Sequence, residues 1–95
     1  MEERFGVAAF RSRQQVMQFE RALRRAGVPC SVITTPRSIA VGCGLSVRFA
    51  LEDARDVHDV YQLARPGNLI GFYRAERTGG QTVVRPLGMQ TGYSG

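Results

Sequence analysis

Residues 30–50 read CSVITTPRSIAVGCGLSVRFA, and this stretch decides how the rest of the chain can be arranged. Its ends, 30–34 and 45–50, are apolar runs. The first contains the β-branched pair Val32 and Ile33, and the second alternates apolar with polar residues, so both predict β-strands. The loop between them has a proline near its start and a cysteine flanked by glycines near its end. We therefore expect strand, loop and strand at the centre of the chain.

The residues before this stretch predict a strand followed by a helix. Residues 5–10 form a short apolar run without helical spacing, which is typical of a buried strand. Ser12 and Gln15 have the spacing of a capping box, which satisfies free backbone donors at a helix start. Apolar residues then recur at steps of three and four up to Ala26, and Gly27 follows where helices commonly end.

The residues after it predict a second helix, a strand and a hairpin. Asp53 can cap the helix, and a Pro-Gly pair at 66–67 ends it. Residues 68–75 carry the apolar side chains of a core strand. A Gly-Gly pair at 79–80 then suits a hairpin turn, with residues 81–87 returning as a further strand.

The order β-α-β-β-α-β predicts an α+β fold of the ferredoxin-like type, with an antiparallel sheet and two helices on one of its faces. We expect a single domain over residues 1–77, followed by a Gly-rich hairpin and tail over residues 78–95 that is partly mobile. The other face of the sheet would be solvated or would pair with a second copy of the chain. A homodimer is therefore an expectation.

Composition narrows the function classes. The chain of 95 residues is 43% hydrophobic and 22% charged, which is ordinary for a soluble globular protein. No apolar run approaches the ~20 residues of a membrane span, and the start MEER lacks the features of a secretory signal, so a cytoplasmic location is expected. The net charge is +5 and all thirteen basic residues are arginine. No basic cluster exceeds Arg24-Arg25, so nucleic acid is not an expected partner.

Histidine and cysteine are scarce. With one histidine and two cysteines, the chain alone lacks the four ligands of a Cys/His zinc site, so we expect no metal. His58 lies off the apolar stripe of the second predicted helix, which favours a solvated position. The alternative, a catalytic base, would need a placed partner.

The loop carries one candidate reactive group, the thiol of Cys43. Gly42 and Gly44 remove the Cβ atoms on either side, so the backbone can adopt positive φ and another molecule can approach closely. Arg37 precedes the cysteine by six residues, and a guanidinium near a cysteine favours the nucleophilic thiolate. Backbone N–H groups at the two glycines would add to this field if they converge as a nest.

Thr35 and Arg37 complete the candidate anion-supporting groups. Pro36 restricts Thr35 to extended geometry and gives Arg37 a stiff base. A structural alternative stays open, in which Gly-Cys-Gly is a tight turn with Cys43 buried as a small hydrophobe. For Cys30, within the first strand of the stretch, packing is the simpler expectation.

The segments Thr35–Arg37 and Cys43–Leu45, with Ile39 between them, resemble a family of small domains described as selenium/sulfur carrier-like proteins. The resemblance runs over about residues 5–73. It implies that the loop cysteine holds sulfur or selenium as a persulfide or selenosulfide, that the loop arginine supports it, and that donor and acceptor proteins are the partners.

Two functions from different classes follow. The first is a cytoplasmic sulfur or selenium carrier that uses an accessible Cys43 thiolate. The second is a non-catalytic ferredoxin-like module that binds a protein or a small anion, with Cys43 only a small residue in a turn. A stand-alone enzyme is less well supported, because the sequence has no Ser/His/Asp spacing and no phosphate-loop pattern, and no cofactor is expected.

Overall fold

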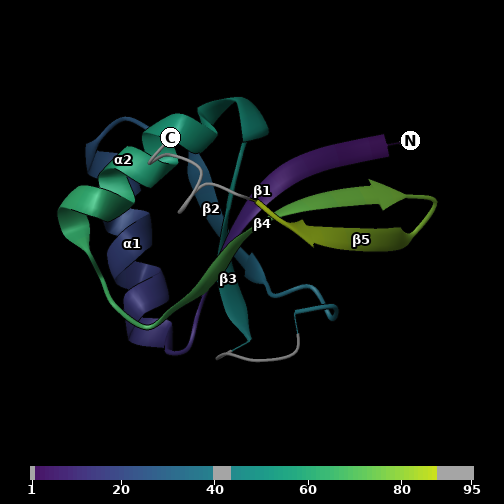
Figure 1. Cartoon of the computed structure of the whole chain (residues 1–95), viewed down its shortest axis with the longest axis horizontal. Helices are drawn as coiled ribbons and strands as arrows, with labels where there is room; N and C mark the ends of the chain where they lie inside the picture. Colours follow the sequence, from purple (N-terminus) through teal and green to yellow (C-terminus); the bar gives the residue numbers. More distant parts are fainter. Residues whose placement is uncertain (1, 40–43, 88–95) are drawn as a thin grey trace.

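The computed structural model describes residues 2–39 and 44–87. Figure 1 shows helices on one side of a twisted sheet. The elements in chain order are β1 (Glu2–Phe10), α1 (Arg13–Arg25), β2 (Cys30–Thr34), β3 (Leu45–Phe49), a short 3-10 turn η1 (Leu51–Asp53), α2 (Ala54–Ala64), β4 (Leu69–Thr78) and β5 (Gln81–Pro86).

The strands form one sheet in the order β2-β3-β1-β4-β5, and every neighbouring pair is antiparallel. The first four strands with the two helices have the order of the ferredoxin-like fold, which confirms the predicted fold class. In the register, Ala8 of β1 lies between Val47 of β3 and Phe72 of β4. Because β1 is central, its residues 5–10 are buried, on both faces of the sheet.

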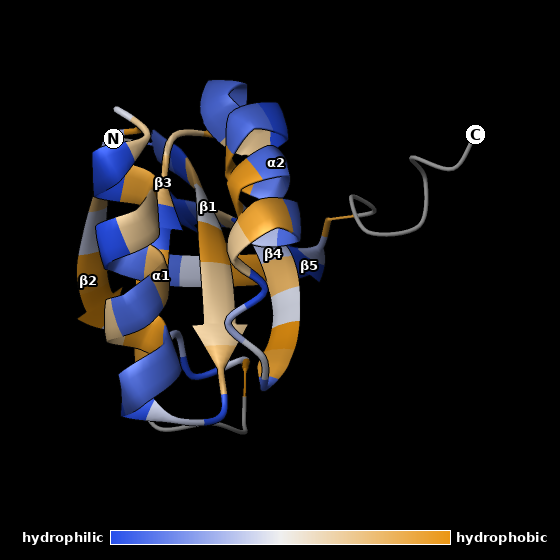
Figure 2. Ribbon diagram, turned by 90° about the vertical axis from the view of Figure 1, so that its left-hand side faces the viewer, coloured by the Kyte–Doolittle hydropathy of each residue, from blue (hydrophilic) through white to orange (hydrophobic). Residues whose placement is uncertain are grey.

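One face of the sheet packs against α1 and α2, which lie side by side on it (Figure 2). This helix-covered face holds the larger cluster of buried side chains. Its centre is Phe19, whose ring centroid lies 5.4 Å from that of Phe10, 6.0 Å from Tyr61 and 6.4 Å from Phe72. Buried aromatic rings of this size contribute a large share of the apolar surface that stabilises a small domain.

The opposite face carries a smaller cluster. Phe5, Val7 and Ala9 of β1 are buried there together with Ala75 of β4 and with Ile39. The sequence predicts solvent or a second copy on this face. Ile39 from the loop after β2 packs on part of it, so this part is covered by the chain itself, and the pairing of the face with a second copy stays a prediction.

Of the two predicted helix caps, the structure confirms the side-chain cap of α1 but not that of α2. Ser12 caps α1 as predicted: its Oγ accepts a hydrogen bond from the Gln15 N–H (3.4 Å) and contacts the Gln15 side chain. Asp53 occupies the cap position of α2 but makes no side-chain capping hydrogen bond. The preceding residues form η1, whose turn closes through the Asp53 N–H and the carbonyl of Ala50 at 2.9 Å.

The solvated position predicted for His58 is wrong. The residue is 8% exposed, beside the fully buried Val57, and its ring lies edge-on to Phe72 with the centroids 6.4 Å apart. A nitrogen of Gln62 lies 3.2 Å from His58 Nε2. The buried side of α2 is therefore broader than the stripe of aliphatic residues suggests, because an imidazole can pack against an aromatic ring.

The predicted hairpin is confirmed. Gly79 and Gly80 have φ of +56° and +85°, the positive values that a two-residue hairpin of type I′ requires. Thr78 pairs with Gln81 on either side of the turn. The hairpin and the start of β1 extend away from the helices (Figure 1). The tail predicted from residue 88 lies outside the described residues. Within residues 2–39 and 44–87, no helix is long and apolar enough to span a membrane.

Candidate functional site

The loop between β2 and β3 has a well-defined base. Thr34 and Leu45 form the last pair of the two strands. Beyond them, the Thr35 N–H donates a 2.9 Å hydrogen bond to the carbonyl of Gly44, and the Thr35 hydroxyl lies 2.7 Å from that of the buried Ser46. Two predicted site residues, Thr35 and Gly44, are thus brought together at the point where the loop leaves the sheet.

Gly44 has the backbone conformation predicted for it. Its φ is +88°, in the region that residues with a Cβ rarely adopt. A Cβ built there would meet no atom within 4 Å, so the demand for glycine comes from the backbone conformation and not from crowding. The residue is exposed, and it allows the chain to turn sharply into β3.

The first half of the loop is fastened to the sheet. The Ile39 N–H donates to the Pro36 carbonyl at 2.9 Å, which closes a turn over residues 36–39. The Ile39 side chain, 7% exposed, packs on Phe5 and its neighbours. The sequence pattern does not predict this anchoring role, because Ile39 stands out there only as one of the residues that carry the family resemblance. A single large apolar residue within a polar turn was the signal that could have found it.

Arg37 sits on this turn, between the Pro36 ring and the buried Ile39, and its side chain is exposed. Among the described residues, it makes no ion pair with Asp or Glu. The remaining predicted site residues, Gly42 and Cys43, lie outside the described residues. The accessibility of the Cys43 thiol and the support that Arg37 gives it therefore stay predictions.

The second cysteine, Cys30, has the environment of a packing residue. It starts β2 and packs against the helix-covered cluster, and its Sγ donates a hydrogen bond to the carbonyl of Glu20 in α1 at 3.7 Å. Burial raises the pKa of this thiol, the negative charge of Glu20 raises it further, and the positive charge of Arg24 lowers it. The thiol is therefore held in its neutral, poorly nucleophilic form.

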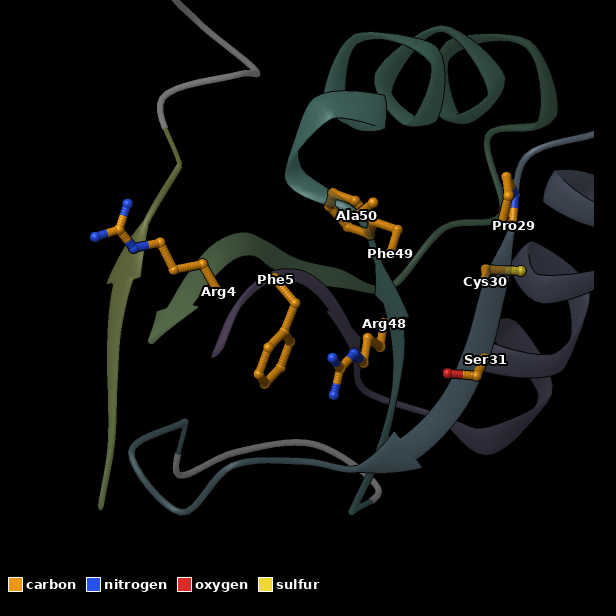
Figure 3. Close-up of a pocket in the computed structure, with 8 residues that line it drawn as sticks. All are labelled: Arg4, Phe5, Pro29, Cys30, Ser31, Arg48, Phe49 and Ala50. Atoms are coloured by element: carbon orange, nitrogen blue, oxygen red, sulfur yellow. The ribbon is translucent and has the colours of Figure 1, made fainter. Parts of the chain in front are cut away.

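A cleft of about 330 Å³ lies beside Cys30 at the end of β2 away from the loop. Arg48 of β3 also lines this cleft. Figure 3 shows that the sulfur of Cys30 points away from Arg48, whereas the hydroxyl of Ser31 points toward it. Along a strand, four residues span about 13 Å, so Cys30 is well separated from Thr34 at the loop base. Cys30 does not belong to the loop site as far as the described residues define it.

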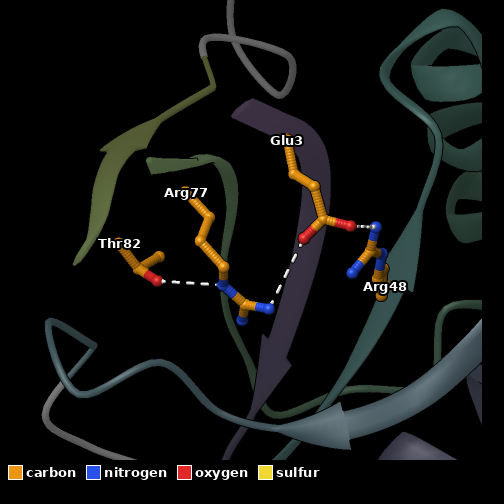
Figure 4. Close-up of polar contacts among 4 residues, drawn as sticks. All are labelled: Glu3, Arg48, Arg77 and Thr82. Carbon is orange, nitrogen blue, oxygen red and sulfur yellow. Dashed lines mark hydrogen bonds and ion pairs between the residues drawn. The ribbon is translucent and has the colours of Figure 1, made fainter. Parts of the chain in front are cut away.

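A charged cluster lies on the loop-covered face, and sequence reasoning did not find it. Glu3 of β1 is contacted by Arg48 Nη2 at 3.3 Å and by Arg77 Nη1 at 3.5 Å (Figure 4). The guanidinium carbons of both arginines also lie over the Phe5 ring, 3.9 Å and 5.6 Å from its centroid. These residues come from three strands, so only the pairing of β1 with β3 and β4 brings them together.

Metal ligands do not gather in the described part of the chain, where no three His, Cys, Asp or Glu side chains are placed to hold one ion.

Comparison with protein families places the chain. The family model described as "Putative Se/S carrier protein-like" matches residues 5–65, which run from β1 to the end of α2 and include the whole loop. The chain belongs to this family. No curated protein and no solved structure matches the chain. The matched range ends before β4, so the β4–β5 hairpin lies outside it.

Proposed function

We propose that this member of the Se/S carrier-like family carries sulfur or selenium on Cys43. The family match over residues 5–65 is the observation that carries the proposal, because it spans the loop from Thr35 to Gly44 and the elements that hold it. The donor would be a protein persulfide or its selenium counterpart, and the acceptor a partner enzyme in a reducing cytoplasm.

The chemistry is a thiol exchange that needs no external oxidant. The Cys43 thiolate attacks the terminal sulfur of a donor persulfide, a new S–S bond forms, and the donor leaves as its thiolate. The persulfide on Cys43 then gives the same sulfur to a nucleophile of the acceptor, which returns the Cys43 thiolate. Each step moves one neutral sulfur atom, so no net oxidation occurs between donor and acceptor.

Features of the described residues support this role for the loop. Ile39 and the Thr35–Gly44 hydrogen bond hold the loop's ends against the sheet, so a thiol between them would be presented from a fixed base. Arg37 has its charge unneutralised by the described acidic residues. A cation near a thiol lowers its pKa and increases the thiolate fraction.

Mass spectrometry tests the proposal directly. The protein is purified without reductant, incubated with a small-molecule persulfide, and its intact mass is measured. We expect added sulfur in the wild type and in Cys30→Ser, and none in Cys43→Ser. Loading that persists in Cys43→Ser and disappears in Cys30→Ser would overturn the assignment. If no variant is loaded while all remain folded, the carrier function itself is wrong.

The pH dependence of alkylation provides a second readout. In Cys30→Ser, we expect half-maximal reactivity of Cys43 well below the ~8.5 of an ordinary thiol, with Arg37→Ala shifting it upward. An ordinary midpoint, unchanged by Arg37→Ala, would contradict thiolate activation. A different outcome would favour the non-catalytic interaction module. In that case neither the wild type nor Cys43→Ser transfers sulfur, but both bind the partner.

A further inference from the structure

A groove of about 390 Å³ lies between the loop after β2 and the tip of the β4–β5 hairpin. Two arginines, Arg37 from the loop and Arg77 from β4, line it. The other described lining residues are Pro36, Gly80 and the hydroxyl residues Thr34, Ser38 and Thr82. No Asp or Glu is among the described residues that line it.

Arg77 is held in place by its neighbours. Its Nε donates to Thr82 Oγ1 across the β4–β5 pair at 3.3 Å, and its Nη1 contacts Glu3 at 3.5 Å (Figure 4). Its guanidinium also lies 5.6 Å from the Phe5 ring centroid. A guanidinium fixed on several sides loses less conformational freedom when it binds a ligand than a free one would.

The charges around the groove leave a positive excess. Glu3 is the acidic partner of Arg77, but Arg48 contacts the same carboxylate at 3.3 Å. One carboxylate thus faces two guanidinium groups, and Arg37 adds a third that no described carboxylate neutralises. Positive charge in a groove concentrates anions near it.

We propose that this groove binds a small oxyanion, the tetrahedral dianion of phosphate or of a phosphate monoester. The planar fork of Arg37 suits two-pronged hydrogen bonding to such oxygens. Arg77 would add the N–H groups that do not contact Thr82 or Glu3, and the hydroxyls of Ser38 and Thr82 add further polar contacts. The groove is large enough for a small ligand. The bound anion would contact both the loop after β2 and the β4–β5 hairpin, and so would link these two segments.

This site goes beyond the proposed carrier function because it uses neither cysteine. It also combines a residue inside the family-matched range, Arg37, with residues of the hairpin outside that range. Arg37 is shared with the proposed carrier loop, but the thiol is not, so Cys43→Ser separates a loss of sulfur loading from a loss of oxyanion binding.

Titration of the ¹⁵N-labelled protein with inorganic phosphate, at constant ionic strength, tests the proposal by NMR. We expect saturable shifts of the Ser38 and Gly80 amides, and an affinity about tenfold lower in Arg37→Gln, because one charge-assisted pair is lost. Arg21→Gln is the matched control: it removes the same charge from an exposed position on α1 and should leave the affinity unchanged.

Further experiments distinguish free phosphate from a phosphate monoester, and oxyanion binding from sulfur loading. A tighter affinity for glycerol phosphate than for phosphate would indicate a phosphorylated metabolite, and equal affinities the free ion. Cys43→Ser should bind phosphate as the wild type does. Arg37→Gln replaces an exposed side chain, so it should stay folded and keep the test decisive. Shifts that do not saturate, or equal weakening by Arg21→Gln, would overturn the proposal.

Discussion

The two faces of the sheet are covered by different parts of the chain. Two helices cover one face and bury a continuous aromatic cluster around Phe19. On the other face, the described chain contributes a single buried side chain from outside the sheet, Ile39, and the arginines of the charged cluster remain partly exposed around it. We therefore expect the helix-covered face to supply most of the stability, whereas the loop-covered face leaves charged side chains accessible to a ligand or a partner.

The largest expected effect lies on the helix-covered face. Phe19 is fully buried and its ring meets three others, so Phe19→Ala should lower the free energy of unfolding by about 3–5 kcal/mol. Urea denaturation followed by circular dichroism measures this. Met17→Ala is the control on the same helix: Met17 is 40% exposed, and its loss should change stability by no more than about 0.5 kcal/mol. If both variants lost similar amounts of stability, the buried and the exposed side of α1 would contribute equally, and the prediction would be wrong.

A smaller effect is expected on the loop-covered face. Ile39→Ala removes the one described loop side chain that packs on Phe5 and Val7, and should cost about 2 kcal/mol, at the lower end for a buried isoleucine, because solvent can refill the site. Ile39→Val should cost about 1 kcal/mol or less. Hydrogen exchange at the Ile39 amide, bonded to Pro36, should accelerate in the alanine variant. If Ile39→Ala lowered the free energy of unfolding as much as Phe19→Ala does, the two faces would contribute equally to stability.

Local patterns were enough to predict most of the fold. The strand over Cys30–Thr34, the cap at Ser12 and the Gly79-Gly80 turn all depend on neighbours within a few residues, and the structure has each of them. The prediction for His58 is wrong because its burial depends on Phe72 of β4, which lies beyond the helix that the local pattern describes. A local pattern cannot anticipate a partner that only the tertiary fold supplies.

The same distinction applies to the candidate site. Residues with strong local demands, such as Gly44 with its positive φ, take the conformation predicted for them. The cluster of Arg77 with Glu3 was not predicted, because it requires the register of β1 against β4, in which Arg77 is the pairing partner of Glu3. Ile39 was overlooked for a similar reason: the sequence does not state over which face of the sheet the loop folds.

The smallest expected effect concerns the thiol on the helix-covered face. In a Cys43→Ser background, alkylation of Cys30 should be half-maximal above the ~8.5 of an ordinary thiol, because burial and the Glu20 charge raise its pKa. Glu20→Gln should lower this midpoint by removing a negative charge. Arg24→Gln should raise it by removing the positive charge that opposes the other two effects. Opposite shifts in these two variants identify electrostatics, and not a change of access, as the cause.

The raised pKa also sets the sign of a stability effect. Below the ordinary thiol pKa, the thiol is protonated in both the folded and the unfolded chain. Between that pKa and the raised pKa of folded Cys30, the unfolded chain releases a proton that the folded chain retains, so the free energy of unfolding falls as pH rises. Cys30→Ser should remove this part of the alkaline destabilisation. If the pH dependence of unfolding is the same with serine at position 30, the pKa of the Cys30 thiol does not differ between the folded and the unfolded chain.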